Sequence, residues 1–175
     1  MIEMELKALL KNKSQVMKKL EKCGCEWGLV CLQEDIIYEK NNMQEVVHAP
    51  IFRIRKCKDK TILTLKVLEE DFDTAEELEL NISDEKTMDK MLQTIGFSTR
   101  IQIVKRRETT NYKGFNICID EVEGLGDFIE VERVGEKRND KNIIYKEIRK
   151  LLLELGVKEE DLRKEKYYEM LLGLV

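Results

Sequence analysis

The chain has 175 residues, of which 38% are charged and 42% are apolar, and its net charge is −4. A chain of this length buries about 70% of its unfolded surface as one domain, so we expect a single domain over residues 1–175. The mixed charges argue against a disordered chain or a nucleic-acid-coating surface, and no apolar run reaches the roughly 18 residues of a membrane span or forms a secretion signal. These features predict a cytoplasmic protein with no nucleic-acid or membrane partner.

Residues 2–7 open the chain with an alternation of apolar and charged side chains. In a β-strand, successive side chains point to opposite faces, so Glu3, Glu5 and Lys7 share one face and the apolar residues share the other. The segment therefore predicts a strand with one apolar and one charged face.

The later segments predict further strands and four helices. Apolar residues at helical spacing, with a cap before or a glycine after most of the segments, indicate helices over 14–23, 84–95, 140–155 and 159–172. Alternating patterns and turn signals indicate strands over 27–38, 51–57, 61–68, 77–82, 98–109, 115–120 and 128–132. The acidic loop over 69–75 lies between two strands and is either a solvated connection or a mobile lid.

Charged side chains recur on one face of these strands. If the faces converge, the interior collects Glu3, Glu5, Glu77, Glu79, Asp120, Glu130 and Glu132 together with Lys7, Arg53, Arg55, Lys66, Lys105 and Arg107. Burying an ion without a partner costs roughly several kcal/mol, so these charges cannot form a core that excludes water and ligands. The charged faces must meet either water or a charged ligand.

Two arrangements satisfy this requirement. An antiparallel sheet with one solvated face is the simpler one. About eight strands are also enough to close into a barrel that holds a small ligand, with helices on its apolar outside. A lumen with both signs of charge suits a polyphosphate and its divalent metal, because arginine and lysine bind phosphate oxygens and carboxylates bind Mg²⁺ or Mn²⁺.

An ordered set of motifs along nearly the whole chain resembles the CYTH family, also called the triphosphate tunnel metalloenzymes. The motifs are Glu3-x-Glu5-x-Lys7, Asp35-x-x-Tyr38, Arg53-x-Arg55, Leu63-Thr64-Leu65-Lys66, Glu77-x-Glu79, Lys105-x-Arg107, Asp120-x-Val122-x-Gly124-Leu125-Gly126-x-Phe128-x-Glu130-Val131-Glu132 and Lys166-Tyr167-Tyr168-Glu169-Met170-Leu171. The family contains the CyaB-type class IV adenylyl cyclases and the thiamine triphosphatases. The resemblance implies an α+β fold, mainly antiparallel, in which an eight-stranded closed barrel forms a tunnel with helices packed outside.

The resemblance also implies roles for the charged residues. The metal-side acids would be Glu3, Glu5, Asp120, Glu130 and Glu132, and the bound ion would be Mg²⁺ or Mn²⁺. The substrate-binding cations would be Lys7, Arg53, Arg55, Lys66, Lys105 and Arg107. Among all of these, the catalytic set would be Lys7, Arg53, Arg55, Lys66 and Glu132. Further possible site residues are Glu77, Glu79, Asp35 and Tyr38.

Three functions fit this resemblance. The glycine-rich segment before Glu130 and the terminal tyrosines favour a CyaB-like adenylyl cyclase that converts ATP to cyclic AMP and pyrophosphate. The chain begins Met1-Ile2 where characterised cyclases often carry a His-Phe pair, and Lys164-Glu165-Lys166 replaces their usual Arg-Ser. A triphosphatase acting on inorganic triphosphate, thiamine triphosphate or a nucleoside triphosphate is therefore the alternative. The third is a module that binds a nucleotide or polyphosphate without turnover.

Cysteine and histidine content completes the expectations. The five cysteines show no C-x-x-C spacing, so we expect reduced thiols, and a lone His48 leaves too few ligands for a zinc site or a histidine-based triad. The apolar faces of the last two helices could pair between subunits, which makes a homodimer possible.

Overall fold

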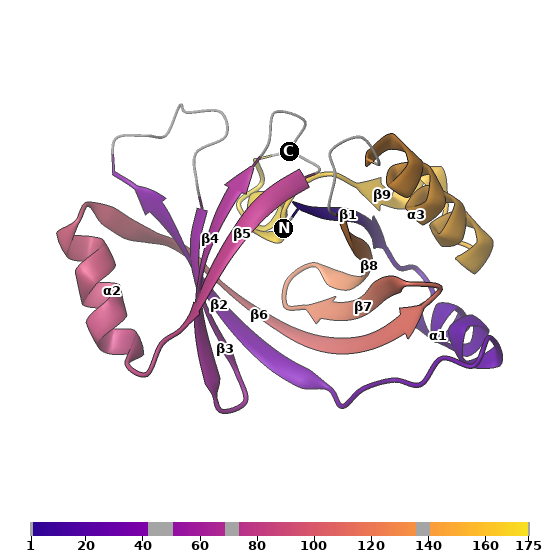
Figure 1. The fold of residues 1–175 in the computed structure, drawn as a ribbon, viewed down its shortest axis with the longest axis horizontal. Helices are drawn as coiled ribbons and strands as arrows, with labels where there is room; N and C mark the ends of the chain where they lie inside the picture. Colours follow the sequence, from indigo (N-terminus) through magenta and orange to yellow (C-terminus); the bar gives the residue numbers. More distant parts are fainter. Residues whose placement is uncertain (1, 42–50, 69–73, 136–140, 175) are drawn as a thin grey trace.

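The computed structural model describes residues 2–41, 51–68, 74–135 and 141–174 (Figure 1). Within them the strands are β1 (Ile2–Leu9), β2 (Cys31–Lys40), β3 (Ile51–Cys57), β4 (Lys60–Leu68), β5 (Thr74–Asn81), β6 (Phe97–Tyr112), β7 (Phe115–Val122), β8 (Gly126–Gly135) and β9 (Leu162–Arg163). The helices are α1 (Lys13–Lys22), α2 (Glu85–Thr94), α3 (Lys141–Leu155) and α4 (Tyr167–Leu171), with a 3-10 turn over Glu159–Asp161. The expected α+β fold is confirmed. None of the helices in these ranges is long and apolar enough to cross a membrane.

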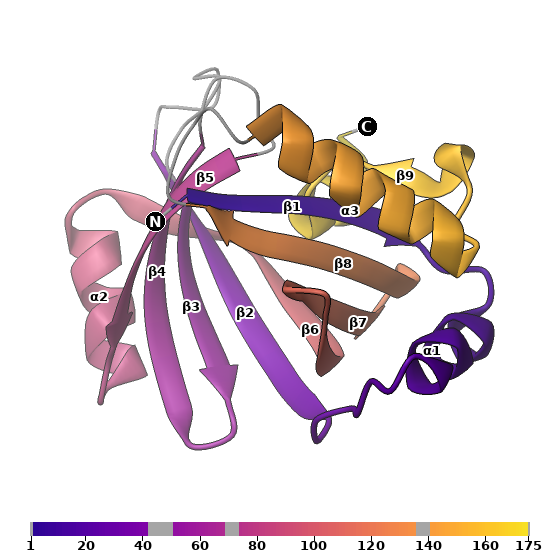
Figure 2. The ribbon, with the colours of Figure 1, turned by 45° about the vertical axis from the view of Figure 1, so that its right-hand side comes forward.

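The strands form one antiparallel sheet in the order β5-β4-β3-β2-β6-β7-β8-β1-β9. β5 additionally pairs with β1 over three residue pairs, from Ile2↔Glu76 to Met4↔Thr74. β9 pairs with the same edge of β1 further along the strand, at Lys7 and Ala8. The sheet therefore curls until its far strand reaches β1, which Figure 2 shows from the side of α3. A barrel that is closed along its whole length stays a prediction.

The alternation along β1 has the structural result that the sequence predicts. Met4 and Ala8 are buried on the outer side of the sheet, in a cluster that contains β7 and β8 residues such as Ile117 and Ile129. Glu5 and Lys7 face the inner side, where they line a cavity. One face of the sheet is thus held by apolar packing and the other is left for charged groups.

Helices cover two parts of the outer face. α3 lies over β1 and β8 (Figure 2). It contributes Ile148 and Leu152 to the apolar cluster, and α1 adds Val16 and Leu20. α2 is capped by Asp84 and packs Leu92 over the outer side of β2, β3 and β4. The apolar face of α3, on which the homodimer expectation partly rested, is therefore buried within the subunit.

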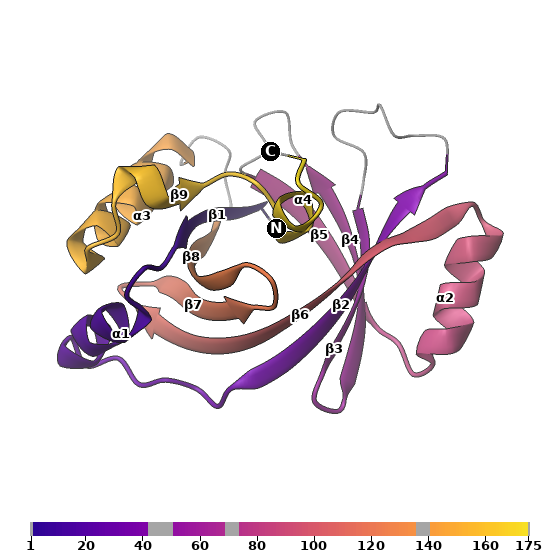
Figure 3. The ribbon, with the colours of Figure 1, turned by 180° about the vertical axis from the view of Figure 1, so that it is seen from behind.

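The single helix predicted over 159–172 is wrong. Gly156, with a φ of 95°, ends α3, and the chain continues as a 3-10 turn, then β9, then the five-residue helix α4. β9 pairs with the edge of β1 that β5 leaves free, and this pairing competes successfully with local helix propensity. Figure 3 shows α4 between the β1–β8 side of the sheet and the β4–β5 side. The ring of Tyr167, the first residue of α4, packs edge-on against the ring of Phe128.

The expectation of five reduced thiols is also wrong. Cys31 on β2 and Cys57 on β3 form a disulfide with a Cα–Cα distance of 6.3 Å, whereas Cys23, Cys25 and Cys118 are free. The β2–β3 ladder places Gln33 opposite Cys57, so Cys31 lies two residues further along β2 on the same face. Strand pairing brings the two cysteines together across 26 positions of sequence, which spacing rules do not detect.

The remaining boundaries differ little from the predictions. The strand expected from residue 27 begins at Cys31, while Trp27 packs beside the cluster under α3. The strand expected over 77–82 begins three residues earlier, at Thr74. Most of the loop expected as a connection or lid, residues 69–73, lies outside the described residues.

Candidate functional site

A cavity of about 370 Å³ lies against the inner face of the sheet. It collects most of the sequence-predicted site residues, namely Glu5, Lys7, Asp35, Arg53, Arg55, Lys66, Glu77, Glu79, Lys105, Arg107, Glu130 and Glu132. Its wall also contains Ile37, Ile51, Thr64, Ile103, Lys166, Tyr167 and Tyr168. The alternating pattern of the strands thus brings both signs of charge into one space.

Two predicted residues lie outside the cavity wall, and the side chain of a third is not described. Asp120 is fully buried behind the lining, where it accepts hydrogen bonds from Lys105 and Arg107. Tyr38 is three residues from Asp35 and lies in the apolar cluster under α2, where its hydroxyl donates to Asp89 Oδ1 at 2.8 Å. The structure does not bring Tyr38 to the cavity. Glu3 belongs to β1, but its side chain lies outside the described part of the structure.

Asp35 holds Arg55 in a fixed orientation. Arg55 donates to both Asp35 oxygens, from Nε and Nη2, at 2.7 Å each. Burial alone would raise the pKa of Asp35, but the guanidinium keeps that pKa below its usual value. The pair places a permanently charged planar group in the wall of the cavity.

Arg53 has longer polar contacts than Arg55 in the described part of the chain. Its Nη2 donates to Thr64 Oγ1 at 3.1 Å, and Glu77 and Glu79 lie further away, at 3.8 and 3.7 Å. Burial and the neighbouring Arg55 guanidinium lower the pKa of Arg53. Its Nε is buried and has no hydrogen-bond partner among the described residues. Because a buried unpaired donor is costly, this atom marks a place where a ligand oxygen would bind favourably.

Lysines from two strands meet carboxylates across the cavity. Lys66 Nζ lies 2.7 Å from Glu77 and 4.0 Å from Glu5, and Lys7 Nζ lies 3.0 Å from Glu130. Burial would raise the pKa values of Glu5 and Glu130, but the neighbouring lysines hold both well below the usual range. These carboxylates are therefore ionised and available as hard oxygen donors.

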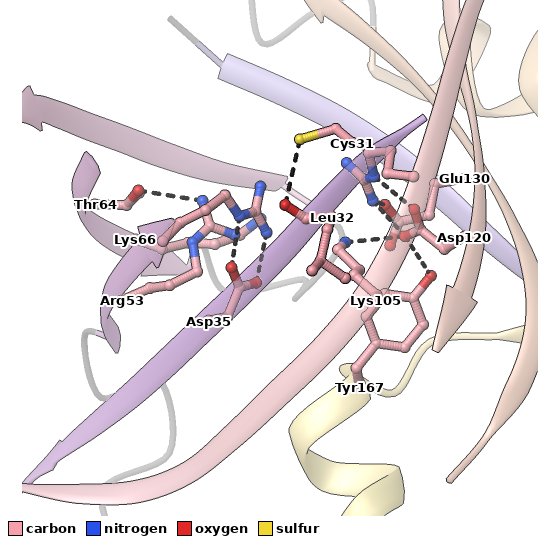
Figure 4. A network of polar contacts seen from close by, with 12 residues as sticks. Cys31, Leu32, Asp35, Arg53, Thr64, Lys66, Lys105, Asp120, Glu130 and Tyr167 are labelled. Carbon is pink, nitrogen blue, oxygen red and sulfur yellow. Dashed lines mark hydrogen bonds and ion pairs between the residues drawn. The ribbon is translucent and has the colours of Figure 1, made fainter. Parts of the chain in front are cut away.

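A second network surrounds Asp120, as Figure 4 shows. Its carboxylate accepts from Lys105 Nζ at 2.9 Å, from Arg107 Nε at 2.6 Å and from the Tyr167 hydroxyl at 3.0 Å. Arg107 also contacts Glu130. Burial and the adjacent Arg107 lower the pKa of Lys105 to about 8. The network fixes Arg107 and Lys105 at the cavity wall through one buried anion.

The acids of β1 and β8 have the chemistry of a divalent-metal site. Glu5 and Glu132 are direct partners in the β1–β8 ladder, and Glu130 lies two residues along from Glu132 on the same face. Like charges directly opposite each other are unfavourable unless a cation lies between them. Carboxylate oxygens are the ligands that Mg²⁺ and Mn²⁺ prefer, so the donor set fits these ions.

The same acids are paired with protein groups in the described structure. Glu5 lies 2.8 Å from Lys166 Nζ, Glu130 contacts Lys7 and Arg107, and Glu132 accepts from Asn116. No three acidic, cysteine or histidine side chains in the described ranges are arranged around a common point. A metal ion at these acids would have to rearrange some of these pairs.

Sequence reasoning missed several wall residues. Thr64 lies two residues before Lys66 on the same strand face, so the alternation that identified Lys66 also identifies Thr64. Lys166, Tyr167 and Tyr168 belong to a terminal motif that the helix prediction placed outside the sheet. Without the contact between β9 and β1, no local pattern indicates that this segment reaches the cavity.

Comparisons with known proteins agree with this geometry. A protein of Methanocaldococcus jannaschii named "Putative adenylate cyclase" is 29% identical over 174 residues, which cover 97% of this chain and 98% of that protein. The solved structure of the PH1819 protein from Pyrococcus horikoshii is 29% identical, has a TM-score of 0.84 and shares 99% of both chains. A Hippeastrum protein shares the fold alone, at 17% identity, with a TM-score of 0.64 over 98% of this chain and 95% of its own; that protein is described as a "putative adenylyl cyclase" that reveals a dominant triphosphatase activity.

The family comparison covers nearly the entire chain. The model of the CYTH domain matches residues 1–167, which include all the strands that line the cavity and the start of the C-terminal segment. The chain therefore belongs to the CYTH domain family.

Proposed function

We propose that this protein is a divalent-metal-dependent enzyme that acts on a triphosphate compound inside the charged cavity. The observation that carries the proposal is the Nε of Arg53, which is buried and has no hydrogen-bond partner within the described part of the chain, beside several other cations of the wall. Arg55, Lys66, Lys105 and Arg107 share the wall with it. Phosphate oxygens are the acceptors that such a set of guanidinium and ammonium groups binds most strongly.

The near balance of charge in the wall supports metal dependence. The lining cations are matched by the carboxylates of Glu5, Glu77, Glu79, Glu130 and Glu132 together with Asp35. A bare triphosphate would add several negative charges to a partly buried site that is already close to neutral, which is unfavourable. A triphosphate that enters with Mg²⁺ or Mn²⁺ brings compensating charge, and Glu5, Glu130 and Glu132 would hold that ion.

The proposed tunnel is the eight-stranded barrel of β1–β8. The β1–β5 pairing supports closure at one end of these strands, and β9 pairs with the same edge of β1 at Lys7 and Ala8. In this arrangement the substrate lies along the inner face, with the phosphate chain against Arg53, Arg55 and Lys66. The catalytic contribution of the chain is positioning and charge neutralisation, which dominate phosphoryl transfer.

The reaction that we propose is that of an adenylyl cyclase. The 3′-hydroxyl oxygen of ATP would attack the α-phosphorus and give up its proton to solvent water. The bond between the α-phosphorus and the oxygen that bridges to the β-phosphorus would break, and pyrophosphate would leave toward the cations. The bound metal would supply Lewis-acid stabilisation of charge on the phosphate oxygens. The resemblance of the chain over 97% of its length to a relative named as an adenylate cyclase supports this choice.

The second candidate is a triphosphatase. A water molecule would attack the terminal phosphorus in the same cavity, and orthophosphate would be released. The wall residues serve either reaction, because both need the phosphate chain held and its charge neutralised. The aliphatic wall of Ile37, Ile51 and Ile103 offers no polar group that recognises adenine, which leaves room for substrates without a base.

One experiment separates the candidates. The protein is incubated with Mg²⁺ or Mn²⁺ and, separately, with ATP, inorganic triphosphate and thiamine triphosphate, and the products are resolved by chromatography. Cyclic AMP with pyrophosphate supports the cyclase, whereas orthophosphate without a cyclic nucleotide supports the triphosphatase. Tight binding without products would leave a non-catalytic binding module.

A variant pair links any turnover to this cavity. Glu130→Gln should lose at least about 100-fold in rate, because it removes a charged group from the metal side of the site. Glu121→Gln is the matched control, since Glu121 is exposed on the neighbouring strand β7. Equal activity in the two variants would rule out the cavity as the site of reaction.

A further inference from the structure

The C-terminal segment enters the cavity through two consecutive residues. Lys166 Nζ lies 2.8 Å from Glu5 Oε1, and the hydroxyl of Tyr167 donates to Asp120 Oδ2 at 3.0 Å. The ring of Tyr167 also lies beneath Lys7 and Lys105, whose Nζ atoms are 4.4 and 5.0 Å from its centroid. The segment thus contacts two of the acids expected on the metal side.

Lys166 supplies charge at a place where carboxylates are crowded. Glu5 lies directly opposite Glu132 in the β1–β8 ladder. Two other lysines lie near Glu5, but each lies closer to another carboxylate: Lys66 is 4.0 Å from Glu5 and 2.7 Å from Glu77, and Lys7 is 3.0 Å from Glu130. The Lys166–Glu5 pair is 16% and 15% exposed, so it is only weakly screened by water. Lys166 is therefore the nearest counter-ion of Glu5 among the described residues.

Lys166 differs from the other wall cations in how firmly its backbone segment is held. Lys7, Arg53, Lys66 and Arg107 belong to strands that pair along most of their length. Lys166 lies between β9, which makes two residue pairs with β1, and the five-residue helix α4. It can leave Glu5 by a local movement of this segment, without the loss of any pairing among β1–β8.

We propose that Lys166 is an internal counter-ion of Glu5 that a divalent metal ion must displace. This inference rests on the proposed metal site at Glu5, Glu130 and Glu132. An ammonium group and a divalent cation repel each other when both contact one carboxylate. Metal loading therefore moves Lys166 off Glu5, and the contact of Lys166 with Glu5 weakens metal binding by the same free energy.

The coupling gives the C-terminal segment a defined role. In the metal-free protein, Lys166 stabilises Glu5 as an ion and helps to seat α4 against the cavity. When the metal is bound, this anchor is lost, whereas the Tyr167–Asp120 hydrogen bond is not opposed by the same repulsion. Lys166 is thus a positioning residue that links the state of the metal site to the seating of α4.

The test measures Mn²⁺ binding without substrate, from the loss of the electron paramagnetic resonance signal of free Mn²⁺. Lys166→Met should bind Mn²⁺ about tenfold more tightly than the unaltered protein, within the range of common coupling energies. Lys166→Arg keeps a cation beside Glu5 and should stay close to the unaltered protein. Lys164→Met, at an exposed position two residues earlier, is the matched control and should leave the affinity unchanged.

The outcomes separate this inference from the proposed function. Glu5→Gln should weaken Mn²⁺ binding, which tests the metal site itself. If it does so while Lys166→Met binds like the unaltered protein, the metal site stands and the role of Lys166 is refuted. If no form binds Mn²⁺ at millimolar concentration, the proposed metal site fails and the counter-ion inference fails with it.

A second measurement is independent of affinity. Trypsin cleaves after lysine, and the bond after Lys166 is held at the start of α4 beside buried Tyr167. Mn²⁺ should accelerate cleavage after Lys166 in the unaltered protein. Lys166→Arg should show the same acceleration. Cleavage that Mn²⁺ slows or leaves unchanged would show that metal loading does not loosen the segment and would refute the coupling.

Discussion

Arg55 and Asp35 are direct partners in the β2–β3 ladder and are joined by two hydrogen bonds of 2.7 Å each. Their side chains are 15% and 6% exposed, so each ion depends on the other for much of its solvation. The pair also sets the plane of a guanidinium group at the cavity wall, beside Arg53. Its strength therefore bears on both the stability of the sheet and the geometry of the phosphate side.

Asp35→Asn should destabilise the protein strongly. The substitution leaves Arg55 as a buried cation without its partner, and breaking a buried pair in this way costs about 3 kcal/mol or more. Urea denaturation at pH 7 measures the loss in the free energy of unfolding. Glu34→Gln, at the exposed neighbouring position, should change that free energy by less than about 0.5 kcal/mol. Equal stability of the two variants would show that the pair contributes little.

The same pair predicts a dependence of stability on pH. The pKa of Asp35 is lower in the folded protein than its ordinary value of 3.8, because the Arg55 guanidinium outweighs the effect of burial. A carboxyl group with a depressed folded pKa contributes stability that is present above its unfolded pKa and is lost as pH falls through the folded one. The difference in unfolding free energy between the unaltered protein and Asp35→Asn should therefore be constant from pH 7 to about pH 5 and shrink below about pH 4. A difference that stays constant down to pH 2 would contradict this assignment.

Much of the fold and of the cavity could be predicted from the alternation of charged and apolar residues along the strands. In β1, β3 and β4 the charges at alternate positions predicted which side chains share a face, because side-chain direction in a strand depends only on local geometry. The inner-face positions of Lys7, Arg53 and Lys66 are confirmed in this way. Their roles in binding or catalysis stay predictions.

The features that failed depend on contacts between distant segments. Residues 159–172 have helical periodicity, but the free edge of β1 draws Leu162 and Arg163 into a strand. Tyr38 and Asp35 belong to the same family motif. They are three residues apart on one strand, so their side chains point to opposite faces, and Tyr38 lies among the apolar residues under α2. Lys166 reaches Glu5 across 161 positions of sequence, a contact that no local pattern encodes.

The disulfide predicts that the oxidised protein has a higher free energy of unfolding than the reduced protein. Cys31 and Cys57 are 26 positions apart, and in the chain-entropy model a cross-link of that span stabilises by about 3–4 kcal/mol. Cys57→Ser should lower the free energy of unfolding by a comparable amount, and a reducing dithiol should have the same effect on the unaltered protein but none on the variant. Cys23→Ser, at an exposed free cysteine, is the control. Alkylation of the unreduced, denatured protein should label Cys23, Cys25 and Cys118 only, and labelling of Cys31 or Cys57 would contradict the disulfide.

Arg53 gives the most direct test of the phosphate side. Arg53→Met removes a guanidinium whose buried Nε has no partner in the residues that the structure describes, while a flexible apolar side chain still fills part of the space. A charge-assisted hydrogen bond contributes about 1.5–3 kcal/mol, so the dissociation constant for a non-hydrolysable triphosphate analogue with Mg²⁺ should rise by roughly 10- to 100-fold. Calorimetric titration measures this change.

Arg106→Met is the matched control for Arg53→Met, because Arg106 is exposed on the outer side of β6, where its Nη1 lies 3.7 Å from Glu121 Oε1. It removes the same charge from the protein, so any effect of net charge on the analogue appears equally in both variants. Weaker binding in Arg53→Met alone places the phosphate chain in the cavity. Equal weakening in both variants would show that the effect comes from long-range electrostatics. Unchanged binding in Arg53→Met would show that Arg53 does not bind the phosphate chain.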